Sequence, residues 1–164
     1  MLLNDYLSKN VELLQGRSVI ELGSGVGITG ILCSGFCHKF VLTDHNDEVL
    51  KIINKNIKLH SCSEDTSPTS HGLVAEKLEW GNKDQINEIL QKHPGGFDFI
   101  LGADIYILIV FNSTFVILEL CIRYSMDSMI ITEASKHQMH LKEVLGTRTI
   151  VGNLEGVIYE TTLE

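Results

Sequence analysis

The chain has 164 residues, of which 44% are hydrophobic and 21% are charged, and its formal net charge is −8. This length and composition suit one globular domain with a real core, so we expect a single domain over residues 1–164. The acidic balance argues against a nucleic-acid-binding protein, which needs a basic face, and no nucleic-acid partner is expected.

Strands and helices are predicted to alternate along most of the chain. Apolar residues at helical spacing predict a helix over residues 2–15, which Gly16 ends. Short apolar runs predict buried strands at 18–22, 39–43, 73–78 and 97–102. The segments between them predict helices at 27–35, at 46–59 and around Ile86, Ile89 and Leu90, with a polar loop at 61–71.

The apolar run at residues 105–122 has the length of a membrane span. Polar residues interrupt its centre at Asn112, Ser113 and Thr114, and Val, Ile and Phe dominate it, so two buried strands joined by a turn explain it better. A membrane segment is the alternative, and no membrane partner is expected. The second of these strands is predicted at 115–122.

The remaining segments predict a helix at 126–138 and two strands, at 140–150 and 155–163, joined by a hairpin at "VGN". The earlier strands are apolar on both faces, which is typical of a parallel sheet covered on both sides. We therefore expect an α/β fold with a doubly wound, mostly parallel sheet and a C-terminal antiparallel hairpin.

The four cysteines contain no CxxC pair, and no segment that resembles a signal peptide precedes the domain. We expect free thiols in a reducing compartment, with the protein in the cytoplasm and the nucleus as a further location. His137 and His140 form a lone HxxH pattern, which makes a poor metal site, so no metal is expected.

The stretch "VIELGSGVGITG", residues 19–30, carries four glycines within eight residues, at positions 23, 25, 27 and 30. Glycine costs chain entropy, so this density suggests that a ligand approaches the backbone closely, at the carboxyl end of the first strand. "GVGITG" matches the GxGxxG pattern of dinucleotide binders, and Asp44 follows at the end of the second strand. A nicotinamide-dependent oxidoreductase is therefore one alternative.

Glu21 argues for a different ligand. A carboxylate beside the turn would oppose a pyrophosphate, and no Lys or Arg lies between Arg17 and Lys39 to meet one. S-adenosylmethionine carries an ammonium and a sulfonium, which an acid attracts. The structural alternatives are that Glu21 caps a local amide and that Asp44 caps the next helix.

Four motifs carry a resemblance to a known family: "ELGSGVG", "LTDHN", "LEWGN" and "FDFILGAD" occur in order after the first four predicted strands. The chain resembles the class I, seven-β-strand methyltransferases, which use S-adenosyl-L-methionine. The tryptophan after the third strand and "GAD" after the fourth are similar to methyltransferase family 16, whose members mostly methylate lysines of proteins. The resemblance implies a lysine-bearing protein as substrate.

The resemblance also implies roles for particular residues. The cofactor would be held by Glu21, Gly23, Ser24, Gly25, Gly27, Asp44, Trp80 and Ala103. Asp44 would hold the ribose hydroxyls and Trp80 would pack at the adenine. Asp104 and Tyr106 would be catalytic, Asp104 orienting the amine and Tyr106 supplying an aromatic wall or its hydroxyl. A core position for Trp80 and helix capping by Asp104 are the alternatives.

The chain departs from the family pattern in three places. It begins after the family's Trp-Pro motif, and in "DIYI" the ring of Tyr106 stands one residue before its usual place, where Ile107 lies. Residues 103–114 are also too few for a crossover helix, because at 1.5 Å per residue a helix cannot run back along a strand of about 20 Å. We therefore expect a shortened crossover and a poorly active chain, and a methyltransferase-like binding or scaffold protein without turnover is a further alternative.

Overall fold

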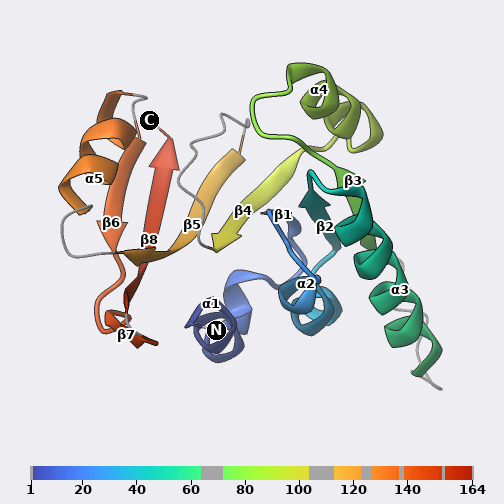
Figure 1. Cartoon of the computed structure of the whole chain (residues 1–164), viewed down its shortest axis with the longest axis horizontal. Helices are drawn as coiled ribbons and strands as arrows, with labels where there is room; N and C mark the ends of the chain where they lie inside the picture. The colour runs from blue at the N-terminus through green and yellow to red at the C-terminus, as the bar shows by residue number, and fades with distance from the viewer. Residues whose placement is uncertain are drawn as a thin grey trace.

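The computed structural model describes residues 2–63, 72–103, 113–122, 127–136, 139–152 and 154–163. Within these residues eight strands form one sheet, in the order β3-β2-β1-β4-β5-β8-β6, and β7 pairs with β8 (Figure 1). The helices cover both faces of the sheet.

Five strands pair in parallel: β1 (Ser18–Leu22), β2 (Lys39–Asp44), β3 (Leu73–Lys77), β4 (Phe97–Ala103) and β5 (Ser113–Ile122). Three pair in antiparallel fashion: β6 (Met139–Glu143), β7 (Thr149–Val151) and β8 (Leu154–Leu163). The helices are α1 (Leu2–Lys9), α2 (Ile28–Cys33), α3 (Asp47–Ser63), α4 (Lys83–Lys92) and α5 (Asp127–Lys136), with 3₁₀ turns η1 (Val11–Leu13) and η2 (Ser34–Phe36). The expected fold class is confirmed.

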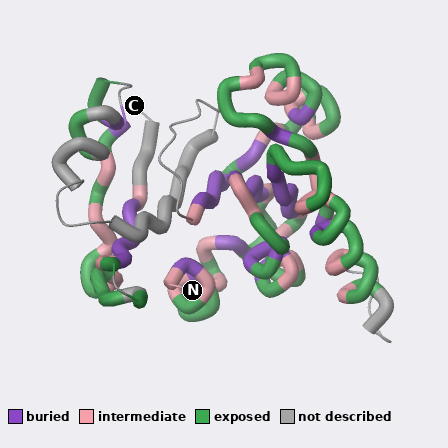
Figure 2. Tube along the Cα trace, in the orientation of Figure 1, coloured by how far each residue is buried: buried purple, intermediate pink, exposed green. Residues whose placement is uncertain are grey.

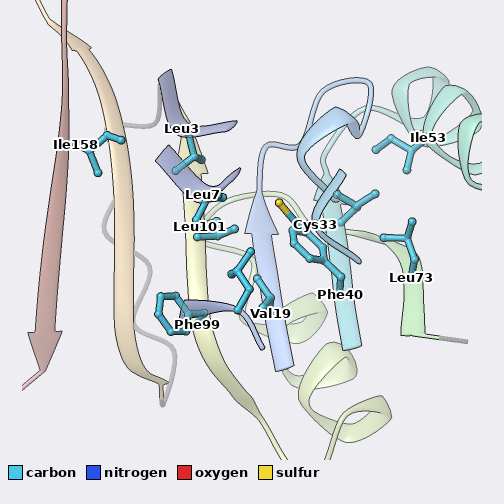
Figure 3. Packing of buried hydrophobic residues seen from close by; sticks show 12 residues of the cluster. Leu3, Leu7, Val19, Cys33, Phe40, Ile53, Leu73, Phe99, Leu101 and Ile158 are labelled. Atoms are coloured by element: carbon cyan, nitrogen blue, oxygen red, sulfur yellow. The ribbon is translucent and has the colours of Figure 1, made fainter. Parts of the chain in front are cut away.

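The core lies in two layers, one on each face of the sheet. Neighbouring strand residues point to opposite faces, so Val19 packs with α1, α2 and α3 while Ile20 packs with α4 and α5. Figure 2 shows the buried residues concentrated along the central strands, and Figure 3 shows Leu3 and Leu7 of α1 projecting toward the sheet. This two-sided burial explains why the strands are apolar throughout their length.

The fourth and fifth strands pair in parallel, with Phe97 opposite Ser113 and Ala103 opposite Glu119. Residues 104–112, which connect them, lie outside the described residues. The strand predicted at 115–122 is confirmed as β5, but it begins at Ser113, so Ser113 and Thr114 belong to the strand and not to the expected turn. The first strand predicted in the long apolar run lies outside the described residues. In the part of the chain that the structure describes, no helix is long and apolar enough to cross a membrane.

The helix predicted over residues 2–15 ends early, at Lys9. Asn10 has a non-helical backbone, with φ −130° and ψ 47°, and its side-chain amide donates to the Tyr6 carbonyl at 2.8 Å. An asparagine that bonds the backbone in this way competes with the helix. The chain therefore continues as the 3₁₀ turn η1, which carries Leu14 into the core.

The strand predicted at 140–150 is two strands, β6 and β7, separated by a turn. Gly146 has φ +83°, and the Thr147 amide donates to the Val144 carbonyl at 3.2 Å. The glycine supplies the left-handed conformation that this turn needs. The hairpin predicted at "VGN" is confirmed, because Val151 pairs with Leu154 across it. Of the polar loop predicted at residues 61–71, residues 61–63 belong to α3, and residues 64–71 lie outside the described residues.

A hydrogen bond joins the first helix to the last strand. The Tyr6 hydroxyl donates to Oε1 of Glu160 at 2.8 Å. Burial, with the hydrogen bond and charge of Glu160, raises the pKa of Tyr6 to about 12. The contact therefore stays intact well above neutral pH and helps to hold α1 against the sheet.

We predict that Tyr6→Phe lowers the free energy of unfolding by about 1–2 kcal/mol, because a hydrogen bond to a charged acceptor is lost. Urea denaturation of the two proteins measures this difference. Ser8→Ala is the matched control, since its hydroxyl bonds only an exposed carbonyl of the same helix and should change stability by less than about 0.5 kcal/mol. Equal effects of the two substitutions would contradict the role given to Tyr6.

Candidate functional site

The polar residues expected at the site gather at the carboxyl edge of the parallel sheet. Glu21 of β1 pairs with Leu42 of β2 on one side and with Leu101 of β4 on the other. The ends of the central strands therefore meet at one edge. In a doubly wound sheet ligands bind outside this edge, where the strand order reverses, which here is between β1 and β4.

The turn after β1 is held to the end of β2 by a compact set of hydrogen bonds. The Ser24 amide donates to the Thr43 carbonyl at 2.8 Å, and the Thr43 amide donates to the Ser24 hydroxyl at 3.0 Å. The Thr43 hydroxyl donates to the Glu21 carbonyl at 2.7 Å. These contacts satisfy polar groups that the turn leaves without ladder partners, so the turn has a defined shape without any ligand.

The glycines of this turn serve two different purposes. A Cβ on Gly30 would lie 2.6 Å from Cδ2 of Leu42, and a Cβ on Gly27 would lie 3.1 Å from Cδ1 of the same residue. These two glycines therefore let α2 pack closely on β2. Gly25 differs, because its φ is +55° and a Cβ there would meet no atom within 4 Å. The sequence suggested that a ligand approaches these glycines closely. At Gly27 and Gly30 the close neighbour is Leu42, whereas space for a ligand remains at Gly25.

Glu21 is buried, with 3% of its surface exposed, and its Oε2 has no hydrogen-bond partner in the described part of the chain. Burial raises the pKa of this carboxyl to about 7, and hydrogen bonding to the side chains of Thr29 and Ser24 offsets only part of that rise. A buried acid with an unsatisfied oxygen is costly unless a partner arrives. A cationic ligand group would supply that partner.

Asp44 ends β2 and is also buried, with 8% of its surface exposed. Its Oδ1 accepts from the Asn46 amide at 2.9 Å, and His45 Nδ1 lies 3.4 Å from the same oxygen. The cap of α3 is Asn46, whose Oδ1 accepts from the Glu48 amide at 2.9 Å. Helix capping, the alternative role for Asp44, is therefore performed by another residue.

Trp80 lies just beyond β3 and is 37% exposed, so it is not a core aromatic. The Leu78 amide donates to the Asp44 carbonyl at 3.0 Å, which ties this segment to the end of β2. Gly81 follows with φ +86°, and Asn82 caps α4 by accepting from the Gln85 amide. Trp80 therefore lies between two anchored residues, Leu78, which is bonded to Asp44, and Asn82, which caps α4.

Ala103 is half-buried at the end of β4, on the face that packs against α1, α2 and α3. Asp104 and Tyr106, the expected catalytic residues, lie outside the described residues, so their roles stay predictions. Among the described residues, no cluster of three or more His, Cys, Asp or Glu side chains could hold a metal ion. The sequence analysis did not identify Thr43, whose hydrogen bonds hold the turn after β1 in place. In the sequence, only its hydroxyl at the end of an apolar strand could have indicated this role.

Comparisons with known proteins agree on one family. A family model described as lysine methyltransferase matches residues 1–143. The protein N-lysine methyltransferase METTL21A of Mus musculus is 28% identical over 145 residues, which cover 80% of this chain and 62% of that protein. EEF1A lysine methyltransferase 3 of Xenopus tropicalis is 38% identical over 94 residues, which cover 57% of this chain and 36% of that one. The chain spans less than two thirds of the length of either relative.

Solved structures support the fold. The M. capricolum TrmK structure, in complex with the cofactor product S-adenosyl-homocysteine, superposes with a TM-score of 0.69 and 13% sequence identity. The superposition covers 99% of this chain and 69% of that one. At this identity the likeness bears on the fold and not on the reaction.

We predict that Gly30→Ala destabilises the protein by about 1–2 kcal/mol, because overpacking against the buried Leu42 outweighs the better helix propensity of alanine. Gly35→Ala is the control, since a Cβ there meets no atom within 4 Å and should change stability by less than about 0.5 kcal/mol. Urea denaturation measures both. Full tolerance of alanine at position 30 would remove the packing explanation.

A second prediction concerns the pH dependence of stability. The folded Glu21 carboxyl keeps its proton up to about pH 7, whereas the unfolded one loses it near its ordinary pKa of 4.5. Stability from this group is therefore greatest below pH 4.5 and is lost as the pH rises through 7. Glu21→Gln should remove this loss, making the variant more stable than the parent by about 3 kcal/mol at pH 8 and by less than about 1 kcal/mol at pH 5.

Urea denaturation across this pH range checks the prediction, with Glu12→Gln on the exposed turn η1 as the control. The control should shift stability by less than about 0.5 kcal/mol at every pH. A difference between Glu21→Gln and the parent that does not change with pH would show that Glu21 is not protonated in the fold.

Proposed function

Because the chain belongs to the lysine methyltransferase family, we propose that it binds S-adenosyl-L-methionine and transfers the methyl group to a lysine side chain of a protein. The observation that carries this proposal is the unsatisfied Oε2 of Glu21, buried beside a preformed glycine turn. An acid in that position favours a ligand with a positive charge and disfavours one that brings a phosphate to the helix.

The residues at the carboxyl edge fit the chemistry of this cofactor. When bound, the cofactor supplies a methyl group on a sulfonium, which is a good leaving group. Glu21 would pair with the ammonium of the methionine part, while Gly23, Ser24 and Gly25 pass close to it. Asp44 would accept hydrogen bonds from the ribose hydroxyls. Gly27 acts on the cofactor through the shape of the turn, because its own Cα faces Leu42.

Trp80 and Ala103 complete the proposed cofactor site. Trp80 is exposed enough to stack on an adenine, and Ala103 is small enough to line the pocket beside it. We propose Asp104 and Tyr106 as the catalytic residues of the acceptor site. Asp104 would orient the lysine amine by hydrogen bonding, and Tyr106 would shield it from water, which favours the neutral amine that attacks.

Two alternatives differ in what they require of this edge. A nicotinamide-dependent oxidoreductase would place a pyrophosphate beside Glu21, with no cationic side chain between Arg17 and Lys39 to balance it. One observation favours a cofactor-binding protein without turnover. Only residues 104–112 connect Ala103 to Ser113, so this short segment must contain both acceptor-site residues and also lead the chain back to the start of β5. Binding and turnover must therefore be measured separately.

The free thiols support a reducing compartment, and we propose the cytoplasm, with the nucleus as a further location. Cys33 and Cys37 are both free, and burial raises the pKa of each thiol to about 12. Thiols with such values remain protonated and unreactive at neutral pH. They act as small core side chains.

We predict that the parent chain binds S-adenosylhomocysteine in calorimetry and does not bind NAD or NADP. Asp44→Ala should weaken this binding by about 1.5–3 kcal/mol, the range for hydrogen bonds that involve a charged group. Asp98→Ala is the matched control, because Asp98 lies at the start of β4 and accepts from the Ser18 amide at the opposite edge of the sheet. Unchanged affinity in Asp44→Ala would exclude the ribose role.

Glu21→Gln should weaken binding of the same ligand above pH 7 although it stabilises the unliganded fold.

Methyl transfer by the parent chain is measured with labelled S-adenosylmethionine and a lysate from cells that lack the protein. Labelled lysine in a lysate protein supports the methyltransferase, whereas tight binding without transfer supports the binding protein.

A further inference from the structure

The outer surface of α2 and α3 carries large apolar side chains that the fold leaves exposed. Five of them are between 44% and 60% exposed: Ile28, Leu32, Phe36, Ile52 and Leu59. We call these five residues the α2–α3 patch. They account for five of the twelve large hydrophobic residues that are exposed in the described part of the chain, so the exposure is concentrated here.

The patch spans two neighbouring helices. Ile28, Leu32 and Phe36 follow one another at intervals of four residues, which places them on one face of α2 and its extension η2. Ile52 and Leu59 are seven residues apart and share one face of α3. The helices pack side by side, because Nδ2 of Asn56 donates to the carbonyl of Val26 at 2.9 Å (Figure 1).

The core does not account for these side chains. The inward side of α2 is formed by Gly30 and Cys33, and that of α3 by Ile53, all of them buried against the sheet. Both helices are therefore apolar on two sides, whereas a helix on the surface of a domain normally needs one apolar side. A second apolar face that groups several large residues marks an interaction surface.

The charges beside the patch indicate what covers it. Lys51 of α3 pairs with Glu48 at 2.7 Å, and from there to residue 63 the helix carries Lys55 and Lys58 and no acid, in a chain whose 21 acids outnumber its 13 bases. All three lysines are exposed. Lys55 lies three residues from Ile52 and four from Leu59, so the lysine row borders the patch directly.

We propose that the α2–α3 patch is a docking surface for an amphipathic, acidic segment of a partner protein. The apolar side of that segment would cover Ile28, Leu32 and Leu59, and its carboxylates would pair with Lys55 and Lys58. Apolar contact supplies the affinity, and the bordering charges select acidic partners over basic ones.

Other occupants fit the same surface less well. A twofold dimer through the patch would bring Lys55 and Lys58 of the two copies close together, and like charges in an interface disfavour this arrangement. An anionic membrane is wider than the patch and would also face the acids elsewhere on this chain, whose net charge is −8, whereas a short acidic segment meets the lysines locally. A nucleic acid would place its phosphates against an apolar centre, where they have no partners.

The test uses the full chain and a fluorescein-labelled peptide of about 18 residues, long enough to hold a helix, with leucines on one face and glutamates on the other. Fluorescence anisotropy measures its affinity. Leu32→Gln and the double variant Lys55→Glu/Lys58→Glu should each weaken binding by at least about tenfold, the scale of an interface residue that matters. A peptide with lysine in place of glutamate should bind the parent at least about tenfold more weakly than the acidic peptide.

Matched controls separate the patch from general effects. Leu145→Gln removes a 91% exposed leucine from the β6–β7 turn, and Lys83→Glu/Lys142→Glu makes the same change in net charge away from α3. Both controls should leave peptide binding unchanged, and thermal unfolding should be the same in all variants.

Several outcomes would overturn the proposal. Equal binding of the acidic and basic peptides, or equal losses in patch and control variants, would remove the selection by charge. A dimer of the parent in sedimentation velocity that Leu32→Gln dissociates would assign the patch to a second copy. The parent is also tested against anionic vesicles and single-stranded RNA. Binding to either that is abolished by Lys55→Glu/Lys58→Glu, and not by Lys83→Glu/Lys142→Glu, would assign the patch to that partner.

Discussion

Leu42 of β2 occupies the space that side chains at positions 27 and 30 would need, and this close packing of α2 on β2 is the constraint on which the site depends. It brings the start of α2 down onto the sheet and leaves only a short turn between β1 and the helix. The hydrogen bonds of Ser24 and Thr43 then fix that turn against the end of β2. Glu21, Gly25 and Asp44 are positioned by this packing before any ligand arrives.

The same packing places a carboxyl group where water cannot reach it. Glu21 contributes nothing favourable to the unliganded fold at neutral pH, and its raised pKa measures that cost. Such a residue is retained in a stable fold when its charge is used by a ligand. In the proposed site, Glu21 would therefore lower the stability of the unliganded fold and strengthen ligand binding, an opposition that is common at functional sites.

The strands and the parallel order were predictable because Val19, Ile20, Phe40 and Val41 are apolar on both faces, and only a doubly covered sheet buries both. The end of the first helix was not predictable, since the side-chain hydrogen bond of Asn10 competes with an otherwise regular helical pattern. The glycine pattern correctly predicted a turn between β1 and α2, where the candidate site is proposed. The pattern could not show which glycines make room for Leu42 and which leave room for a ligand, because Leu42 belongs to another strand.

The contact between Tyr6 and Glu160 also bears on how the chain folds, because it joins positions separated by 154 residues. Contacts of such long range form slowly, since the loop between them must close first. During synthesis α1 leaves the ribosome long before β8 exists, so its buried leucines have no completed sheet to pack against. Because α1 precedes β8 in the chain, its leucines must rely on transient contacts until the strand that completes their packing has been made.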